Sequence, residues 1–85
     1  MNKTKMVYFY TKHNCKLCEE AKQMLQIFQS EYQFTIVEQN IYQDERLLEK
    51  YFMTIPVIRV DHEEITAEDL SFVTVEKFLA KNLKG

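Results

Sequence analysis

The spacing of apolar and polar residues predicts alternating strands and helices along the 85 residues. Apolar residues predict three strands: Lys5–Tyr10, Phe34–Gln39 and Ile55–Val60. A tight turn at Asp61-His62 then predicts a hairpin with a short fourth strand, Glu64–Thr66. Helical spacing predicts three helices: Lys16 to about Gln29, Asp44–Phe52, and a last one that starts at Ser71 or Thr74. The order β-α-β-α-β-β-α predicts an α/β fold, with a four-stranded mixed sheet flanked by helices on both faces.

Each predicted helix carries one apolar stripe, and its members are the expected core residues. In the first helix they are Leu17, Ala21, Met24, Leu25 and Phe28. In the second they are Leu47, Leu48, Tyr51 and Phe52, and in the last Val75, Phe78, Leu79 and Leu83. The second strand is expected to contribute Phe34, Ile36 and Val37.

Length and composition narrow the functional classes. A chain of 85 residues is expected to form one domain, residues 1–85. The formal net charge is −2 and the basic residues are scattered, so no nucleic-acid partner is expected. No apolar run approaches the ~20 residues of a membrane span, and no small-residue cleavage site follows the first apolar run, so we expect a cytoplasmic protein without a membrane partner.

The only two cysteines lie in Cys15-Lys16-Leu17-Cys18, between a predicted strand and a predicted helix. In a reducing compartment, a lone pair at this spacing is more often catalytic or metal-binding than structural. Residues i and i+3 of a helix are neighbours with Cβ atoms roughly 5–6 Å apart, close to what a disulfide needs. The spacing therefore favours a redox-active pair.

The position of each cysteine on the helix predicts its role. A helix N-terminus exposes free N–H groups and stabilises a thiolate, so the Cys15 pKa should fall below its ordinary value of about 8.5. Lys12 and Lys16 add positive charge nearby. Cys18 lies one turn deeper and should be less exposed. We therefore expect Cys15 to attack a disulfide and Cys18 to resolve the mixed disulfide that forms.

A second landmark is Thr54-Ile55-Pro56, at the start of the third predicted strand. Proline is tolerated at the first residue of a strand, and it is also the residue at which cis peptide bonds occur. A cis bond here would present the Ile55 backbone groups outward, where an extended peptide can pair with them. A trans bond is the alternative that the sequence leaves open.

Together these segments resemble the glutaredoxins and, more broadly, the thioredoxin superfamily. The stretch Val7–Lys22 is similar to the family's first strand, active-site loop and first helix, and Thr54-Ile55-Pro56-Val57 is similar to its cis-proline loop. Within that family the chain looks closest to a group of small, uncharacterised glutaredoxin-like proteins. The resemblance implies a thioredoxin-like fold of the glutaredoxin type and a thiol–disulfide oxidoreductase.

The resemblance also assigns roles to individual residues. It implies that Cys15 and Cys18 are catalytic and that Pro56 is cis. The substrate-binding candidates are Lys12, Lys16, Leu17, Ile55 and Pro56. Lys12 matches a lysine that often meets the glutathione carboxylate. The substrate would be a disulfide-containing protein or a small thiol, and glutathione or a thioredoxin-reductase-type enzyme would be the reductant.

Two stretches depart from the usual glutaredoxin pattern. Lys16-Leu17 stands where the family usually carries Pro-Tyr, and the stretch Glu64–Asp69 holds no Gly-Gly turn. That turn normally holds the γ-glutamyl end of glutathione, and Glu64 and Glu68 are poorly suited to a negatively charged tripeptide. Glutathione therefore remains a candidate co-substrate beside a protein disulfide. We expect a monomer without a bound cofactor.

Two other functions remain open at this stage. In the first, the cysteines hold zinc, with His13 and His62 as the only histidines, or a shared iron–sulfur cluster. In the second, the chain is a thioredoxin-fold adaptor whose thiols are inert. A normal Cys15 pKa would indicate the adaptor, and stoichiometric metal would indicate the first alternative.

Overall fold

The structure, a computed structural model, describes residues 4–83, so the two ends of the predicted domain 1–85 lie outside the described residues. The strands are β1 (Lys5–Thr11), β2 (Phe34–Asn40), β3 (Val57–Val60) and β4 (Glu63–Ile65). The α-helices are α1 (Lys16–Gln29), α2 (Glu45–Tyr51) and α3 (Phe72–Leu83), and two short 3₁₀ turns are η1 (Ile41–Gln43) and η2 (Ala67–Asp69). The predicted order of strands and helices is confirmed.

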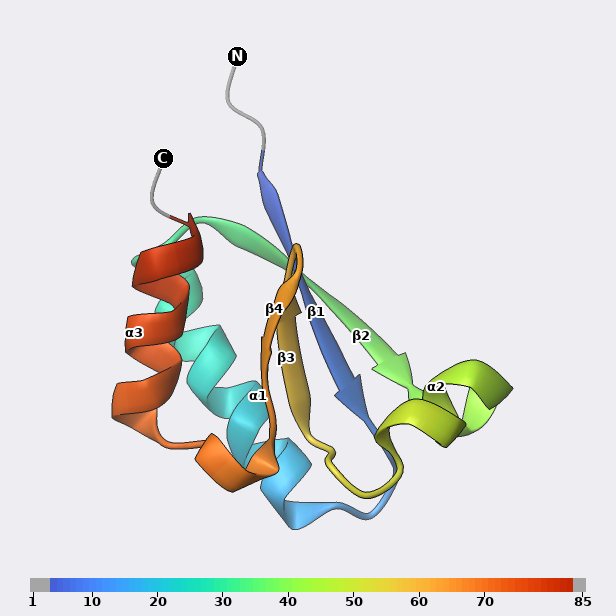
Figure 1. Cartoon of the computed structure of the whole chain (residues 1–85). Coiled ribbons are helices and arrows are strands. Elements are labelled where there is room, and N and C mark those ends of the chain that lie inside the picture. Colours follow the sequence, from blue (N-terminus) through green and yellow to red (C-terminus); the bar gives the residue numbers. More distant parts are fainter. Residues whose placement is uncertain (1–3, 84–85) are drawn as a thin grey trace.

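The four strands form one mixed sheet in the order β2-β1-β3-β4 (Figure 1). β1 pairs with β2 in parallel, while β3 is antiparallel to both β1 and β4. Helices α1 and α3 lie together on one face of the sheet, and α2 lies on the other (Figure 1). The predicted fold class, an α/β fold with helices on both faces of a mixed sheet, is confirmed.

Most of the core lies between the sheet and the α1–α3 pair. Its buried side chains include Val7, Phe9, Leu25, Phe28, Ile58, Val60, Val75 and Leu79. A smaller cluster on the α2 face contains Tyr10, Ile41, Tyr51 and Val57, and the Tyr10 and Tyr51 rings stack at 4.6 Å. Burial on both faces explains why β1 and β3 are almost continuously apolar.

Side-chain caps fix where the second and third helices begin. The Asp44 carboxylate accepts the backbone N–H groups of Arg46 and Leu47 at the start of α2. Ser71 Oγ accepts the Thr74 N–H at 3.1 Å at the start of α3, so Ser71, one of the two expected starting residues, is the cap. Asp44 therefore precedes the helix that it was expected to begin.

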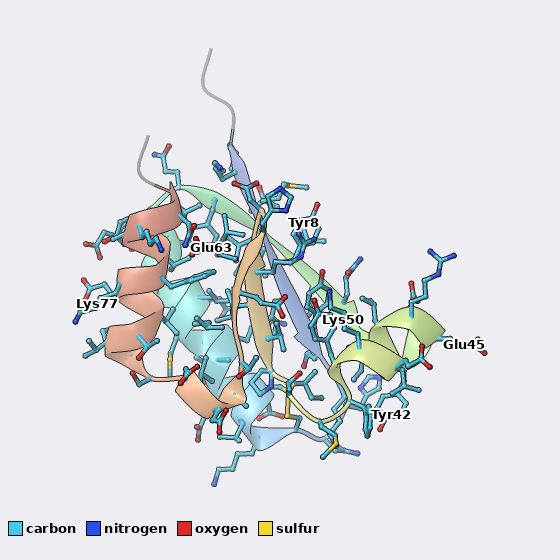
Figure 2. All side chains as sticks on the ribbon, in the orientation of Figure 1. Tyr8, Tyr42, Glu45, Lys50, Glu63 and Lys77 are labelled. Carbon is cyan, nitrogen blue, oxygen red and sulfur yellow. A yellow bond between two sulfur atoms is a disulfide. The ribbon has the colours of Figure 1, made fainter. Side chains whose placement is uncertain are left out.

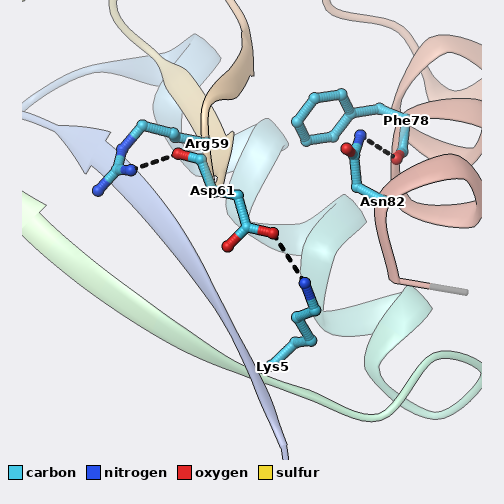
Figure 3. Close-up of polar contacts among 5 residues, drawn as sticks. All are labelled: Lys5, Arg59, Asp61, Phe78 and Asn82. Atoms are coloured by element: carbon cyan, nitrogen blue, oxygen red, sulfur yellow. Dashed lines mark hydrogen bonds and ion pairs between the residues drawn. The ribbon is translucent and has the colours of Figure 1, made fainter. Parts of the chain in front are cut away.

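Two polar contacts hold the turn of the β3–β4 hairpin, and one of them ties it to β1 (Figure 3). Asp61 adopts a positive φ of 54° in the turn, as Asp tolerates better than most residues. Its carboxylate meets Lys5 Nζ at 2.8 Å, and its carbonyl accepts Arg59 Nη1 at 2.6 Å. The predicted Asp61-His62 turn is confirmed.

Several predicted boundaries and burials are wrong. The third strand begins at Val57 instead of Ile55, because the Ile55 N–H donates to the Tyr51 carbonyl at the end of α2. The fourth strand is Glu63–Ile65 instead of Glu64–Thr66. Leu17 and Phe52, expected in the core, are 53% and 58% exposed because each lies at a helix end that the sheet does not cover.

The last helix faces the core as expected, since Val75, Phe78 and Leu79 are buried and Leu83 packs against them. Its final turn is held partly by Asn82, whose side-chain amide donates to the Phe78 carbonyl at 2.9 Å (Figure 3). Within residues 4–83, no helix has the length and hydropathy that crossing a membrane requires.

Candidate active site

Cys15 and Cys18 form a disulfide at the start of α1, and their Cα atoms are 5.1 Å apart. Cys15 is half-buried, whereas Cys18 is 2% exposed and belongs to the main core. The expectation that Cys18 is the less exposed of the pair is confirmed. Cys15 is therefore the more accessible of the two residues to a partner that approaches from solvent.

Cys15 is itself the N-terminal cap of α1. Its backbone is extended, with φ −124° and ψ 105°, and its Sγ accepts the Cys18 backbone N–H at 3.1 Å. Its carbonyl accepts the Glu19 N–H at 3.1 Å, which closes the first turn. The Cys15 sulfur thus occupies the place of a capping oxygen, where helix N–H groups and the helix dipole favour negative charge.

The loop that carries Cys15 is short and mostly exposed. Lys12, His13 and Lys16 are exposed around the disulfide, and Asn14 adopts a positive φ of 55° that turns the chain from β1 into α1. Asn is one of the few non-glycine residues enriched in this region of φ. The loop therefore places two lysines beside Cys15 without a glycine.

A second segment, residues 52–56, reaches the same end of the sheet (Figure 1). The Ile55–Pro56 peptide bond is cis, Pro56 is buried, and half-buried Ile55 packs against the core cluster that also receives Cys15. The Ile55 N–H is used within the chain, so the expectation that both Ile55 backbone groups face outward is wrong for the N–H. Within residues 4–83, no backbone N–H outside the helices and strands donates to the Ile55 carbonyl.

The third segment is the turn η2, which lies in the stretch Glu64–Asp69 that was expected to differ from glutaredoxins by having no Gly-Gly turn. Its Ala67 N–H donates to the Thr54 carbonyl at 3.0 Å and so ties η2 to the proline loop. Glu68 and Asp69 are exposed on this turn. Glu64 belongs to the other face of the sheet, because its carboxylate accepts the Tyr51 hydroxyl at 2.9 Å.

Apolar side chains lie exposed on the segments that carry these features. Leu17, between the two cysteines, is 53% exposed, and Met53, three residues before Pro56, is 81% exposed. The structure thus brings Lys12, Lys16 and Leu17 to the disulfide loop and Ile55 and Pro56 to the neighbouring segment. Met53 was not among the expected site residues, because a lone Met in a turn has no periodic signal.

The residues considered for a metal do not gather. Within residues 4–83, no three His, Cys, Asp or Glu side chains are grouped so that they could hold a metal ion. His62 lies in the β3–β4 turn, at the opposite end of the sheet from the disulfide (Figure 1).

A second polar cluster lies on the α2 face, where Figure 2 shows Tyr8 and Lys50. Arg59 Nε donates to the Tyr10 hydroxyl at 3.1 Å, and the Arg59 guanidinium lies 4.4 Å from the centre of the Tyr8 ring. Burial, followed by the hydrogen bond to Glu64, raises the pKa of Tyr51 to about 12. The same surroundings keep Tyr51 neutral, so we treat this cluster as structural.

Comparisons with known proteins agree with this arrangement. The family model of the glutaredoxin-like domain (DUF836) matches residues 6–84. No curated protein matches the chain.

Three solved structures are similar to it in fold. Protein Ne2328 from Nitrosomonas europaea is 22% identical, with a TM-score of 0.73 over 92% of this chain and 94% of its own. A malarial protein is 16% identical, with a TM-score of 0.68 over 95% of this chain and 99% of its own. The germline-specific thioredoxin Deadhead from Drosophila melanogaster is 16% identical, with a TM-score of 0.64 over 92% of this chain and 80% of its own.

Proposed function

We propose that this chain, which belongs to the glutaredoxin-like domain family (DUF836), is a thiol–disulfide oxidoreductase. The observation that carries the proposal is the asymmetry of the cysteine pair. Cys15 is half-buried and its Sγ receives a helix N–H, whereas Cys18 is buried one turn later. This is the arrangement that a nucleophilic thiol and a resolving thiol require.

In the proposed reaction, the Cys15 thiolate attacks a disulfide of the substrate. A bond forms between Cys15 Sγ and one substrate sulfur, and the other substrate sulfur leaves as a thiolate. Cys18 Sγ then attacks Cys15 Sγ, which forms the Cys15–Cys18 disulfide and releases the second substrate thiol. The substrate is reduced by two electrons and the cysteine pair is oxidised by two.

We further propose that the partner is a cysteine-containing peptide segment that lies across the loop of Cys15 and the proline loop. The exposed apolar side chains of Leu17 and Met53 suit a peptide with an apolar residue near its cysteine. The Ile55 carbonyl offers one backbone acceptor, and the ammonium groups of Lys12 and Lys16 suit a carboxylate, including that of glutathione.

Two single substitutions test the assignment of roles. Cys15→Ser should abolish exchange with a disulfide substrate, because the attacking thiolate is gone. Cys18→Ser should accumulate a mixed disulfide on Cys15, which intact mass spectrometry detects as the mass of the substrate thiol. The roles would be reversed if Cys15→Ser were active and Cys18→Ser inactive.

A further inference from the structure

A hollow of about 190 Å³ lies beside Cys18, between the loop after β1, the first turns of α1, and β2. Cys18 forms part of its wall although its side chain is 2% exposed. The charged and titratable residues around the hollow are Lys12, His13, Glu19, Lys22 and Glu38. Its volume has room for several water molecules, each of which occupies about 30 Å³ in the liquid.

Glu38 reaches this hollow from the core-facing side of β2. It pairs directly with Phe9 of β1, so both side chains lie on the face of the sheet that α1 covers. Phe34 and Ile36 precede Glu38 on that side of β2 and pack against the core. A carboxylate thus continues a row of core side chains and ends at the hollow that reaches Cys18.

An ion pair holds the Glu38 carboxylate there. Lys22 lies four residues after Cys18 on α1, so the two side chains are neighbours on one helix face. Lys22 Nζ meets Glu38 Oε1 at 2.9 Å, with both side chains a little over 40% exposed. Two acidic residues line the hollow, Glu19 and Glu38, and of these two only Glu38 forms an ion pair within residues 4–83.

The proposed exchange reaction gives this carboxylate a task. After Cys15 has formed a mixed disulfide, Cys18 must lose its proton before its sulfur can attack. Burial among apolar side chains disfavours the thiolate. A proton acceptor within reach, directly or through one water, would make the attack faster near neutral pH.

We propose, on the basis of the function proposed above, that Glu38 accepts the Cys18 proton through water in this hollow. The Cys18 S–H bond breaks, and its proton passes to the Glu38 carboxylate. The Cys18 thiolate then attacks Cys15 Sγ, the Cys15–Cys18 bond forms, and the partner sulfur leaves with the electron pair of the broken bond. Glu38 returns the proton to solvent. Lys12 and Lys22 favour the transient thiolate, and Lys22 also orients Glu38.

The test separates the two thiol steps by rapid mixing of the reduced protein with 5,5′-dithiobis(2-nitrobenzoate). The first phase is the attack of Cys15, and the second is the attack of Cys18 on the mixed disulfide. Each phase releases one coloured thiolate. At pH 7, Glu38→Gln should slow the second phase tenfold or more and change the first less than about twofold. The difference should shrink as pH rises, because hydroxide replaces the carboxylate.

Three variants serve as comparisons. Glu38→Asp keeps a carboxylate and should recover most of the rate of the second phase. Glu63→Gln breaks a similarly exposed ion pair, that with Lys81 at 3.2 Å, and should leave both phases unchanged. His13→Gln should leave the second phase within about twofold of the wild-type rate if Glu38 is the acceptor.

Each other result overturns a defined statement. A second phase in Glu38→Gln that equals the wild-type rate, or that is slowed by the same factor at every pH, would overturn the role of Glu38. A second phase that is slow only in His13→Gln would assign the proton to His13 instead. If the wild-type first phase were no faster than that of an ordinary thiol, the proposed function itself would fail, and the inference with it.

Discussion

Tyr51 is the side chain whose titration ties most directly to stability. It is 3% exposed, stacks on Tyr10 and donates its hydroxyl to Glu64. Burial, then the Glu64 contact, raises the pKa of Tyr51 to about 12, above the ordinary 10.0. The Tyr51 hydroxyl holds its proton more tightly in the folded protein than in the unfolded one, so its contribution to stability is complete below pH 10. This contribution is lost as the pH rises from about 10 to about 12.

We therefore predict that the free energy of unfolding of the wild-type protein falls more steeply between pH 10 and pH 12 than that of Tyr51→Phe. A pKa raised from 10.0 to about 12 corresponds to about 2–3 kcal/mol of difference in that window. Urea unfolding followed by circular dichroism at pH 9, 11 and 12 measures it. Parallel pH dependence of the two proteins would show that the Tyr51 hydroxyl is not protected in the folded state.

Individual residues show where the sequence was informative and where it was not. The exposure difference between Cys15 and Cys18 could be predicted from helix position alone. Leu17 and Phe52 fit a helical stripe, but burial also requires an element opposite each of them, and periodicity carries no information on that. Glu38 did carry a signal, since it is the one charged residue of the second predicted strand, yet its contact with Lys22 depends on strand register.

At the level of elements, α1 presents two exposed aliphatic residues in different surroundings. Leu17 lies at its start, between the cysteines, and Ile27 lies near its end; they are 53% and 58% exposed. Both should tolerate a polar residue with a stability change of about 0.5 kcal/mol or less. Only Leu17 lies where a partner of Cys15 would rest.

We predict that Leu17→Ser slows the reaction of Cys15 with an apolar peptide disulfide several-fold, while Ile27→Ser leaves it unchanged. The rate of reaction with a small disulfide such as cystine should change little in either variant, because the bound cystine is too small to contact Leu17. Second-order rate constants from thiol-release assays give the comparison. Equal rates for the two variants on the peptide would remove Leu17 from the binding surface.

The order of elements followed from the sequence because each long element has a clear period. The turns η1 and η2 did not, since three residues are too few to show one. The late start of β3 also escaped the pattern. Ile55 is apolar and fits the pattern of a strand, but its N–H donates to the Tyr51 carbonyl at the end of α2, a contact that the pattern does not predict.

For the molecule as a whole, the sheet order follows from two local rules: a strand–helix–strand unit gives the parallel β1–β2 pair, and a tight turn gives the β3–β4 hairpin. Neither rule predicts the junction of the two, β1 beside β3, or the convergence of the three site segments at one end of the sheet. They depend on long-range pairing, such as Phe9 with Ile58, that periodicity does not report.

At the scale of the whole molecule, we predict that the fold does not depend on the disulfide. The largest buried side chains, such as Phe9, Leu25 and Leu79, lie in the core between the sheet and two helices. A disulfide across three residues constrains the unfolded chain little, by roughly 2 kcal/mol on the chain-entropy estimate. We therefore expect the protein to stay folded when the pair is reduced.

The most direct measurement is a redox titration of the purified, metal-free protein in glutathione buffers. Samples are quenched with acid, their free thiols are alkylated, and the products are analysed by intact mass spectrometry, while circular dichroism follows the fold. We predict a reversible two-electron transition of Cys15 and Cys18 with one midpoint and an unchanged spectrum. Two alkylated thiols at every ratio of glutathione to its disulfide would contradict the account, as would loss of the folded spectrum on reduction.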